Sequence, residues 1–416
     1  ASWGKNRSVK DTDFFERALE LKSPWFVEEV RMDVQAKRVE VIIGCQSRAW
    51  GDPQSGERLH IHGYEKRRWR HLDTMQFETV LVADVPRVKY PDGHTELVSV
   101  PWAQPHGRFT LMFEGWAIAV LRACRTVSDA CELLDLSWDT AQTIMEGAVK
   151  RGIERREVQN IQRVGIDEKS FGRGQDYISV LTDLDHPRVI EVVPGRDKGA
   201  ACSLFKTLPA QELEKLQAVA MDMSETFAAA AREMAPQADI VYDRFHVSQA
   251  LNQAVDQVRR AENKALLAEG DERLKGTRQT WLFNPKNLQD HRLESLSDLA
   301  RQNLKTSRAW LHKENFEGFW DLESRWYGQR YLRDWYNSAI RSRLEPIKRV
   351  ARTLKAHTTG LINYFTHHIT NAVTEGLNSR IQDLKSAARG FRNFHHYRIR
   401  ILFFCGKLEL QPALSA

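Results

Sequence analysis

The sequence lacks a long apolar run, a cysteine framework and any internal repeat. No stretch of about 18 apolar residues occurs, so no helix is expected to span a membrane. The five cysteines are scattered and odd in number, which argues against paired disulfides and favours a reducing, cytoplasmic setting. Residues 1–5 also lack the apolar core of a secretory signal peptide. What remains is a globular chain of 416 residues, long enough for two to four domains.

Positive charge is in moderate excess and is unevenly distributed. The formal net charge is +6 and the pI is about 9.0, which is compatible with nucleic-acid binding without requiring it. Residues 301–400 hold 19 lysines and arginines against 8 aspartates and glutamates. A solvated basic face would produce the same excess, so charge alone leaves DNA binding and an ordinary surface equally open.

The N-terminal quarter contains two different patterns. Residues 1–35 predict one helical segment, with its helix from Asp11 to Glu20. Residues 36–108 are rich in the alternation of strands, as in Arg38–Ile43 and Phe77–Val82, with prolines between them. This second region predicts a small β-rich module.

Residues 109–157 predict a pair of helices. The first is short and capped by Ser128, Leu136-Ser137 forms a turn, and the second runs from Trp138 to Arg151 with an apolar stripe on one face. A short helix, a tight turn and a longer helix are typical of a helix-turn-helix DNA-binding domain. An ordinary helical hairpin that serves packing or dimerisation is the alternative.

Residues 158–269 alternate between strand and helix patterns. Three strands come first, and Asp167 is expected at the end of the first, after Val164-Gly165-Ile166. Two further strands end at Asp222 and Asp243, and a helix follows each. The order β-β-β-α-β-α-β-α predicts a mixed sheet with helices on both faces. This α/β arrangement is the strand order of the ribonuclease-H-like nucleotidyl-transferase fold.

The remaining residues predict helices. Residues 270–368 are helical, aromatic and basic, and they predict an all-helical insertion into the ribonuclease-H-like core. Its tryptophans either pack the insertion or, for one or two of them, stack on DNA bases. Residues 369–416 contain a final helix, from Asn371 to Ala387, and a basic-aromatic tail over residues 391–398.

Three carboxylates have the pattern of a metal site. Asp167 and Asp222 each follow apolar strand residues, where a charged group is costly unless it is paired or bound to metal. The first and fourth strands of this topology are neighbours, so the two acids are expected to converge. Glu375, on the final helix beside the first strand, completes a set of hard oxygen ligands that suits Mg²⁺ or Mn²⁺. Turn-forming or salt-bridged surface acids are the alternative interpretation of this spacing.

Several sequence blocks are specific as a set. They are His62–His71, Val100–Trp102, Gly165–Glu168, Asp243–Val247, Asn252, Asp256–Arg259, Thr370–Asn378 and Gly390–Arg392. Together they resemble the bacterial insertion-sequence transposases of the ISL-three family, and the resemblance runs nearly from end to end.

The resemblance implies a DDE transposase that cleaves double-stranded DNA at the terminal inverted repeats of its element and joins the ends to target DNA. It implies that Asp167, Asp222 and Glu375 form a catalytic triad that holds two Mg²⁺ or Mn²⁺ ions, which clamp the attacking and leaving oxygens of a phosphoryl displacement. Asp243 is the rival second acid; otherwise, with His246, it is expected to support the site. A homodimer on DNA, in the cytoplasm and the bacterial nucleoid and with no membrane partner, is expected.

The expected DNA contacts include the second helix of the predicted pair. Gln142 and Thr143, near its start, are expected to face base edges, and Gln142 can make a bidentate contact to adenine. Lys150 and Arg151, at its far end, are expected to touch phosphates. The other candidates are arginines of the basic block and of the tail: Arg67, Arg68, Arg70 and Arg392.

One departure from the family concerns zinc. The family usually carries an N-terminal zinc-binding module built from paired cysteines, but Arg48 stands where the partner of Cys45 is expected. A structural zinc site needs four Cys or His ligands. The available candidates are poorly spaced for such a site: Cys45, His60, His62 and His94. We therefore expect a degenerate zinc-ribbon-like module that folds by packing, without zinc.

Two other functions share many of these features. A repressor derived from a transposase would keep DNA binding and lose catalysis, but all three acids are intact in this sequence. A nuclease on the same fold would cut DNA without joining strands. Metal-dependent nicking tests the first alternative, and a strand-transfer assay tests the second.

Overall fold

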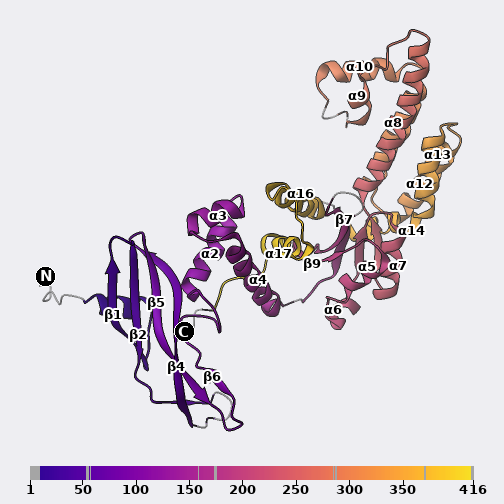
Figure 1. Cartoon of the computed structure of the whole chain (residues 1–416). Coiled ribbons are helices and arrows are strands. Elements are labelled where there is room, and N and C mark those ends of the chain that lie inside the picture. Colours follow the sequence, from indigo (N-terminus) through magenta and orange to yellow (C-terminus); the bar gives the residue numbers. More distant parts are fainter. Residues whose placement is uncertain are drawn as a thin grey trace, which may run out of the picture. The chain divides into compact units, whose positions relative to one another are not determined.

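The structure, a computed structural model, describes residues 10–52, 56, 58–157, 159–172, 176–283, 285, 288–369 and 372–413. The chain divides into two compact units, one of residues 1–156 with 408–416 and one of residues 157–407 (Figure 1). Within the described ranges, no helix is both long and apolar enough to cross a membrane.

The first unit begins with a helix and a six-stranded sheet. These are α1 (Asp11–Ala18), β1 (Trp25–Asp33), β2 (Arg38–Cys45), β3 (Ala49–Gly51), β4 (Arg58–Thr74), β5 (Phe77–Lys89) and β6 (Thr95–Leu97). The sheet order is β1-β2-β5-β4-β3, with β6 paired to β5. The predicted helix and the strands at Arg38 and Phe77 are confirmed. Strand β1 was not predicted, because a bulge between Val27 and Glu29 and its exposed second half remove the alternation.

Tryptophan side chains fill the core of this sheet. The ring of Trp102 lies 5.0 Å from that of Trp25 and 5.5 Å from that of Trp69, measured between centroids. Trp50 lies 5.8 Å from Trp25. Trp25, Trp69 and Trp102 are buried in one cluster with Phe15 of α1. Such ring pairs add about 0.5–1.5 kcal/mol each beyond their buried area, so the module has an apolar core of its own.

Three helices follow the sheet: α2 (Leu111–Ala123), α3 (Val127–Leu134) and α4 (Trp138–Arg155). Helices α3 and α4 confirm the predicted pair, and α4 runs one turn beyond its predicted end. The cap of α3 differs from the prediction. Thr126, not Ser128, accepts a hydrogen bond from Asp129 N at 3.1 Å, and the Asp129 carboxylate accepts one from Thr126 N. This reciprocal capping box satisfies two main-chain donors that Ser128, already inside the helix, could not reach.

The segment 408–413 also belongs to the first unit. Leu408 and Leu410 are buried, and the main-chain oxygen of Leu410 accepts a hydrogen bond from Arg151 at 3.0 Å. A Cβ added to Gly152 would lie 2.7 Å from the Cβ of Leu408, so glycine lets the segment approach α4 closely. Residues from the other end of the chain therefore complete the unit that contains α2, α3 and α4.

The second unit is built on a five-stranded sheet. Its strands are β7 (Arg163–Ser170), β8 (Tyr177–Asp183), β9 (Arg188–Pro194), β10 (Ala218–Met221) and β11 (Asp239–Tyr242), in the order β11-β10-β7-β8-β9. Strands β7, β8 and β9 are antiparallel, whereas β10 is parallel to both β7 and β11. The prediction that the first and fourth strands are neighbours is confirmed.

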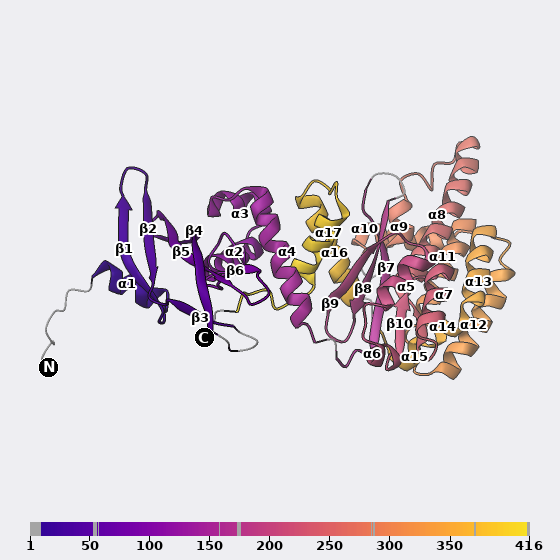
Figure 2. The same ribbon diagram turned by 60° about the horizontal axis from the view of Figure 1, so that its bottom comes forward.

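Helices cover both faces of this sheet. Every residue of β8 from Ile178 to Asp183 is buried, and successive strand residues point to opposite faces. Helix α5 (Lys198–Phe205) contacts β8 and β9, and α7 (Glu225–Met234) contacts β10, with the short α6 (Ala210–Glu214) between them in sequence. Helices α16 (Ala372–Ala387) and α17 (Phe394–Cys405), in yellow, lie together beside the strands (Figure 2).

Helix α8 (Arg244–Ala268) runs away from the sheet into the predicted helical insertion (Figure 1). The insertion contains α9 (Arg278–Leu282), α10 (Asp290–Ala300), α11 (Lys305–Glu317), α12 (Arg325–Ile340), α13 (Glu345–Ala356), α14 (Thr358–Ile362) and α15 (Tyr364–His367). Of its five tryptophans, Trp281, Trp320 and Trp335 are buried and Trp310 is half-buried. Trp326 is 60% exposed. Packing therefore accounts for four of the five.

Residues 391–398 do not form an extended tail. Helix α17 begins at Phe394, and the side chain of Asn393 caps it by accepting a hydrogen bond from His395 N at 2.8 Å. The guanidinium of Arg398 makes two hydrogen bonds of 2.6 Å to Glu191 of β9. Most of the basic and aromatic residues of this segment therefore belong to α17. Arg398 connects that helix to the sheet through Glu191.

Candidate functional site

Asp167 lies in β7, and two side chains hold its carboxylate. Strand residues two apart share a face, so Asp167 and Lys169 project to the same side of the sheet. Lys169 Nζ lies 3.0 Å from Asp167 Oδ2, and Asn378 Nδ2 of α16 donates to the same oxygen at 2.6 Å. Only 15% of the Asp167 side chain is exposed. The carboxylate is therefore nearly fixed in position.

Helix α16 packs along β7, which confirms the prediction that the final helix lies beside the first strand. Lys385 donates a hydrogen bond to Ser170 O at 2.6 Å. A Cβ added to Gly165 would lie 2.6 Å from Thr182 Oγ1 of β8 and 3.3 Å from Thr374 Oγ1 of α16, so glycine leaves room for both side chains. Asn371, the first residue of the predicted helix, lies outside the described residues.

Asp222 follows β10, which is the neighbour of β7. Burial raises the pKa of Asp222 above its usual value, and the negative charge of Asp167 raises it further. The charge of His246 and the N–H of Ser224, which donates to Asp222 at 3.2 Å, act in the opposite direction. Two acids influence each other in this way only when they are close. The sheet therefore brings the acids of β7 and β10 together.

Asp243 follows β11 and joins the same group of acids. Burial, aided by the charges of Glu375 and Asp167, raises the pKa of Asp243 to about 6. Its carboxylate also caps α8, because it accepts a hydrogen bond from Phe245 N at 2.8 Å, and it lies 3.8 Å from His246 Nε2. We name the four interacting carboxylates the acidic cluster: Asp167, Asp222, Asp243 and Glu375.

The acidic cluster has the chemistry of a divalent-metal site. Hard carboxylate oxygens that repel one another suit Mg²⁺ or Mn²⁺. Over the part of the chain that is described, no three His, Cys, Asp or Glu side chains are gathered closely enough to surround one ion. Glu375 is exposed at the start of α16, and the ammonium of Lys169 neutralises Asp167. The donor set fits a divalent cation in type and charge.

Two residues of the site were not assigned a role from the sequence, although periodicity contains a signal for both. Asn378 lies three residues after Glu375, a spacing that puts both on one side of a helix. Lys169 lies two residues after Asp167, a spacing that puts both on one face of a strand.

The structure alters the expected DNA contacts on α4. Gln142 is only 4% exposed, and its amide donates to Glu146 at 2.9 Å, so it is not positioned to read a base. Arg151 is held by Glu114 at 2.7 Å and by the Leu410 carbonyl, so its guanidinium does not face a phosphate.

Other candidates keep their exposure. Thr143 and Lys150 are exposed on α4, four and eleven residues after the exposed Asp139, which is the spacing of one helix face. Arg392, just before α17, is also exposed. These three residues remain candidates for DNA contact.

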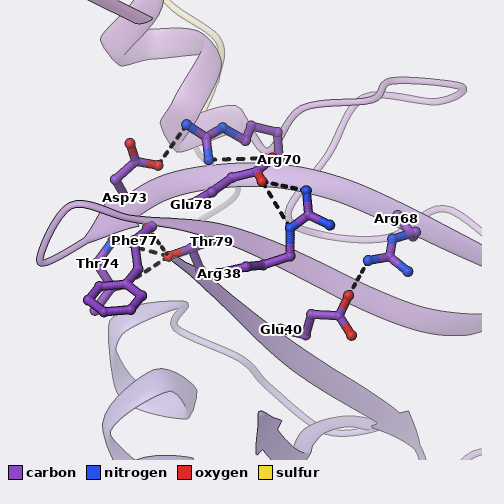
Figure 3. A network of polar contacts seen from close by, with 9 residues as sticks. All are labelled: Arg38, Glu40, Arg68, Arg70, Asp73, Thr74, Phe77, Glu78 and Thr79. Carbon is purple, nitrogen blue, oxygen red and sulfur yellow. Dashed lines mark hydrogen bonds and ion pairs between the residues drawn. The ribbon is translucent and has the colours of Figure 1, made fainter. Parts of the chain in front are cut away.

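The basic block of β4 is largely paired within the sheet (Figure 3). Arg70 is mostly buried, 2.7 Å from Asp73 and 3.7 Å from Glu78, which removes it from the expected DNA contacts. Arg68 forms an ion pair with Glu40 but remains half exposed. Arg67 donates to Gly107 O at 3.2 Å, close to the ring of Trp69.

The candidate zinc ligands are spread over the module. Cys45 ends β2, and His60 and His62 lie on β4. His94 pairs with Asp92 at 2.5 Å and stacks on the ring of Tyr90, with the centroids 4.1 Å apart.

Three family models match the chain. The model described as transposase matches residues 164–401, which is more than half of the chain. The helix-turn-helix domain of transposase family ISL3 matches residues 98–149, which include α2, α3 and most of α4. The zinc-finger of transposases IS204/IS1001/IS1096/IS1165 matches residues 48–93. Those residues contain no cysteine, so this match identifies the module but not a set of ligands, and the expected lack of zinc stays a prediction.

Individual relatives agree with the family models. The transposase for insertion sequence element IS1557 of Mycobacterium tuberculosis is 29% identical over 352 residues, which is 79% of each chain. The transposase for insertion sequence element IS1001 of Bordetella parapertussis is 25% identical over 355 residues, which is 84% of this chain and 87% of the relative. With its transposase and helix-turn-helix domains, the chain belongs to the ISL3 family of transposases.

Proposed function

We propose that this transposase is a DDE enzyme that cleaves DNA at the ends of its element and transfers the freed 3′-hydroxyl into target DNA. The proposed catalytic triad consists of Asp167, Asp222 and Glu375. The observation that supports the proposal is that the charge of Asp167 of β7 acts on Asp222 after β10, while Asp167 and Glu375 of α16 both act on Asp243. Buried carboxylates with raised pKa values, here Asp222 and Asp243, are characteristic of functional sites rather than of ordinary surfaces.

The sheet topology supports a ribonuclease-H-like core. Three antiparallel strands are followed by two parallel ones, and the fourth strand lies against the first. The helical insertion comes after the fifth strand, and the final helix returns to pack on β7. This arrangement lets residues more than two hundred positions apart serve one site.

Two divalent ions held by the triad would stabilise the charge on the attacking and leaving oxygens of a phosphoryl displacement. The chain's own residues prepare that site. Asn378 holds Asp167 in one orientation, and Lys169 supplies the positive charge that the carboxylates need when no cation is present.

Asp222 is preferred over Asp243 as the second acid. Asp222 follows the strand that is paired directly with β7. The carboxylate of Asp243 is already committed to the N-terminus of α8 and to His246. Asp243 and His246 are therefore proposed as positioning residues beside the triad, where they order water or a phosphate.

DNA recognition is proposed for the first unit. The helix-turn-helix domain would select the terminal inverted repeats through the exposed face of α4, with Thr143 toward the bases and Lys150 toward phosphate. Two copies of the protein acting as a homodimer would engage the two ends of the element. Residues 36–108 are proposed to fold by tryptophan packing without zinc, which metal analysis of the purified protein tests.

The decisive experiment is incubation of the full chain with its element's ends and a target plasmid in Mg²⁺. We expect nicks at the ends and joined products, both absent in EDTA. DNA binding without nicking would indicate a repressor derived from a transposase, and nicks without joined products would indicate a nuclease. Asp167→Asn is the matched control, because it removes one charge from the cluster and keeps the side-chain shape.

A further inference from the structure

A polar groove runs between α11 and α12, within the helical insertion. It has a volume of about 530 Å³ and is lined by Arg308 and His312 of α11, by Ser338 of α12, and by Arg341, Ser342 and Arg343 after it. A second hollow of about 430 Å³ shares His312 and Ser338 with the first, so the groove continues along the two helices.

The groove carries unbalanced positive charge. Arg308, Arg341 and Arg343 are exposed, and across the described residues none of them has an ion pair with a carboxylate. Nearby arginines behave differently: Arg330 and Arg333 of α12 both pair with Asp334. Arg308 is also close enough to His312 that its charge, after burial, lowers the pKa of that histidine. Three unpaired guanidinium groups therefore face one polar hollow.

The backbone at Arg343 adds a second observation. This residue has a φ of 60°, a left-handed conformation that favours glycine and disfavours long side chains. The preceding Ser342 fixes the turn, because its hydroxyl accepts a hydrogen bond from Leu344 N at 3.2 Å. Glycine at position 343 would suit this turn better than arginine. Position 343 therefore carries an arginine although the local backbone conformation favours glycine.

We propose that this groove binds the phosphate backbone of DNA through Arg308, Arg341 and Arg343. The proposal rests on the proposed function in that DNA is the substrate. Guanidinium groups match phosphate oxygens in a bidentate geometry, and hydroxyl groups such as those of Ser338 and Ser342 are common phosphate partners. The second hollow is lined by aromatic side chains and by Arg330, which pairs with Asp334, so the three arginines of the first hollow carry the contact. The contact is independent of base sequence and gives the second unit its own hold on DNA.

The test measures binding of the full chain to random-sequence duplex DNA over a range of salt concentrations. Each phosphate contact contributes about 0.9 to the slope of log K against log salt. We expect each of Arg308→Gln, Arg341→Gln and Arg343→Gln to lower that slope by about 0.9. Arg333→Gln is the matched control: it removes one exposed arginine of α12 that is already paired, and the slope should stay unchanged.

Arg343→Gly separates binding from folding. Because glycine suits the left-handed turn, this variant should keep or raise the melting temperature while the salt slope falls as it does for Arg343→Gln. An unchanged slope in the triple variant Arg308→Gln/Arg341→Gln/Arg343→Gln would overturn the proposal. So would saturable binding of inorganic phosphate to the groove without any change in the DNA slope, since that result would identify a small-anion site.

Failure of this inference and failure of the proposed function have different signatures. If the wild type nicks element ends in Mg²⁺ but the triple variant keeps its salt slope, only the groove assignment is wrong. If the wild type does not nick DNA but the triple variant shows a smaller slope of log K against log salt, the groove assignment is confirmed and the catalytic proposal is wrong.

Discussion

Replacing Asn378 with alanine removes the amide that holds the first acid of the triad. The Asn378 Nδ2 to Asp167 Oδ2 distance is 2.6 Å, and the carboxylate is mostly buried. A hydrogen bond to a charged group of this kind contributes about 1.5–3 kcal/mol. Since 1.4 kcal/mol corresponds to a factor of ten, the apparent affinity for Mg²⁺ should fall by about 10- to 100-fold.

The assay is the initial rate of nicking at element ends as a function of Mg²⁺ concentration. For Asn378→Ala we expect the half-saturating Mg²⁺ concentration to rise while most of the maximal rate returns at high Mg²⁺. Ser379→Ala, at the exposed neighbouring position of α16, is the matched control and should behave as the wild type.

An Asn378→Ala titration curve that superimposes on the wild-type curve would refute this reasoning, since Asp167 would then need no support to bind the ion. A lower half-saturating concentration would refute it equally. Retained end-DNA binding by the variant shows that any loss lies in the metal step.

Three further predictions concern the triad, a buried histidine and the C-terminal segment. Alanine at any member of the triad should abolish nicking and leave end-DNA binding within a few-fold of wild type; an active Asp222→Ala together with an inactive Asp243→Ala would reverse the assignment of the second acid. Burial lowers the pKa of His71 to about 4, so the unfolded chain takes up this proton below pH about 6.5 while the folded chain does not. The free energy of unfolding should therefore fall by about 3 kcal/mol between pH 6.5 and pH 4, and urea titrations of His71→Gln should lose this part of the pH dependence. Leu410 is 3% exposed against the helix-turn-helix unit, so Leu410→Ala should destabilise that unit by about 2–5 kcal/mol and weaken end-DNA binding, whereas Glu409→Ala, at an exposed position, should not.

The order of strands and helices could be predicted because it depends on local patterns. Two patterns were informative: the apolar runs that end at Asp222 and Asp243, and the alternation of apolar and polar residues after Asp167. Both involve residues close in sequence, so they do not depend on tertiary contacts. The helix pair at residues 109–157 was recognisable for the same reason. Strand β1 was missed because its bulge and its exposed half leave no regular period.

The acidic cluster was only partly predictable. Strand ends and topology suggested that Asp167 and Asp222 would meet. That Asn378 holds Asp167, and that the charge of Glu375 acts on Asp243, depends on side-chain distances between elements far apart in sequence.

The sequence by itself determined the family, the order of elements and the acids after β10 and β11, because these depend on residue identity and local periodicity. The expectation that Asp167 ends its strand was wrong, since β7 continues to Ser170 through its pairing with β8. Only the tertiary structure decided which polar groups are available. Gln142 lies at the edge of the apolar stripe of α4, and whether such a residue is buried depends on what packs there. Arg70 and Arg151 are of a residue type that often contacts DNA. In the structure, however, each forms an ion pair with a carboxylate of this chain. Whether a charged side chain is paired depends on its distance from side chains on other elements. The spacing of residues along one helix or strand does not predict that distance.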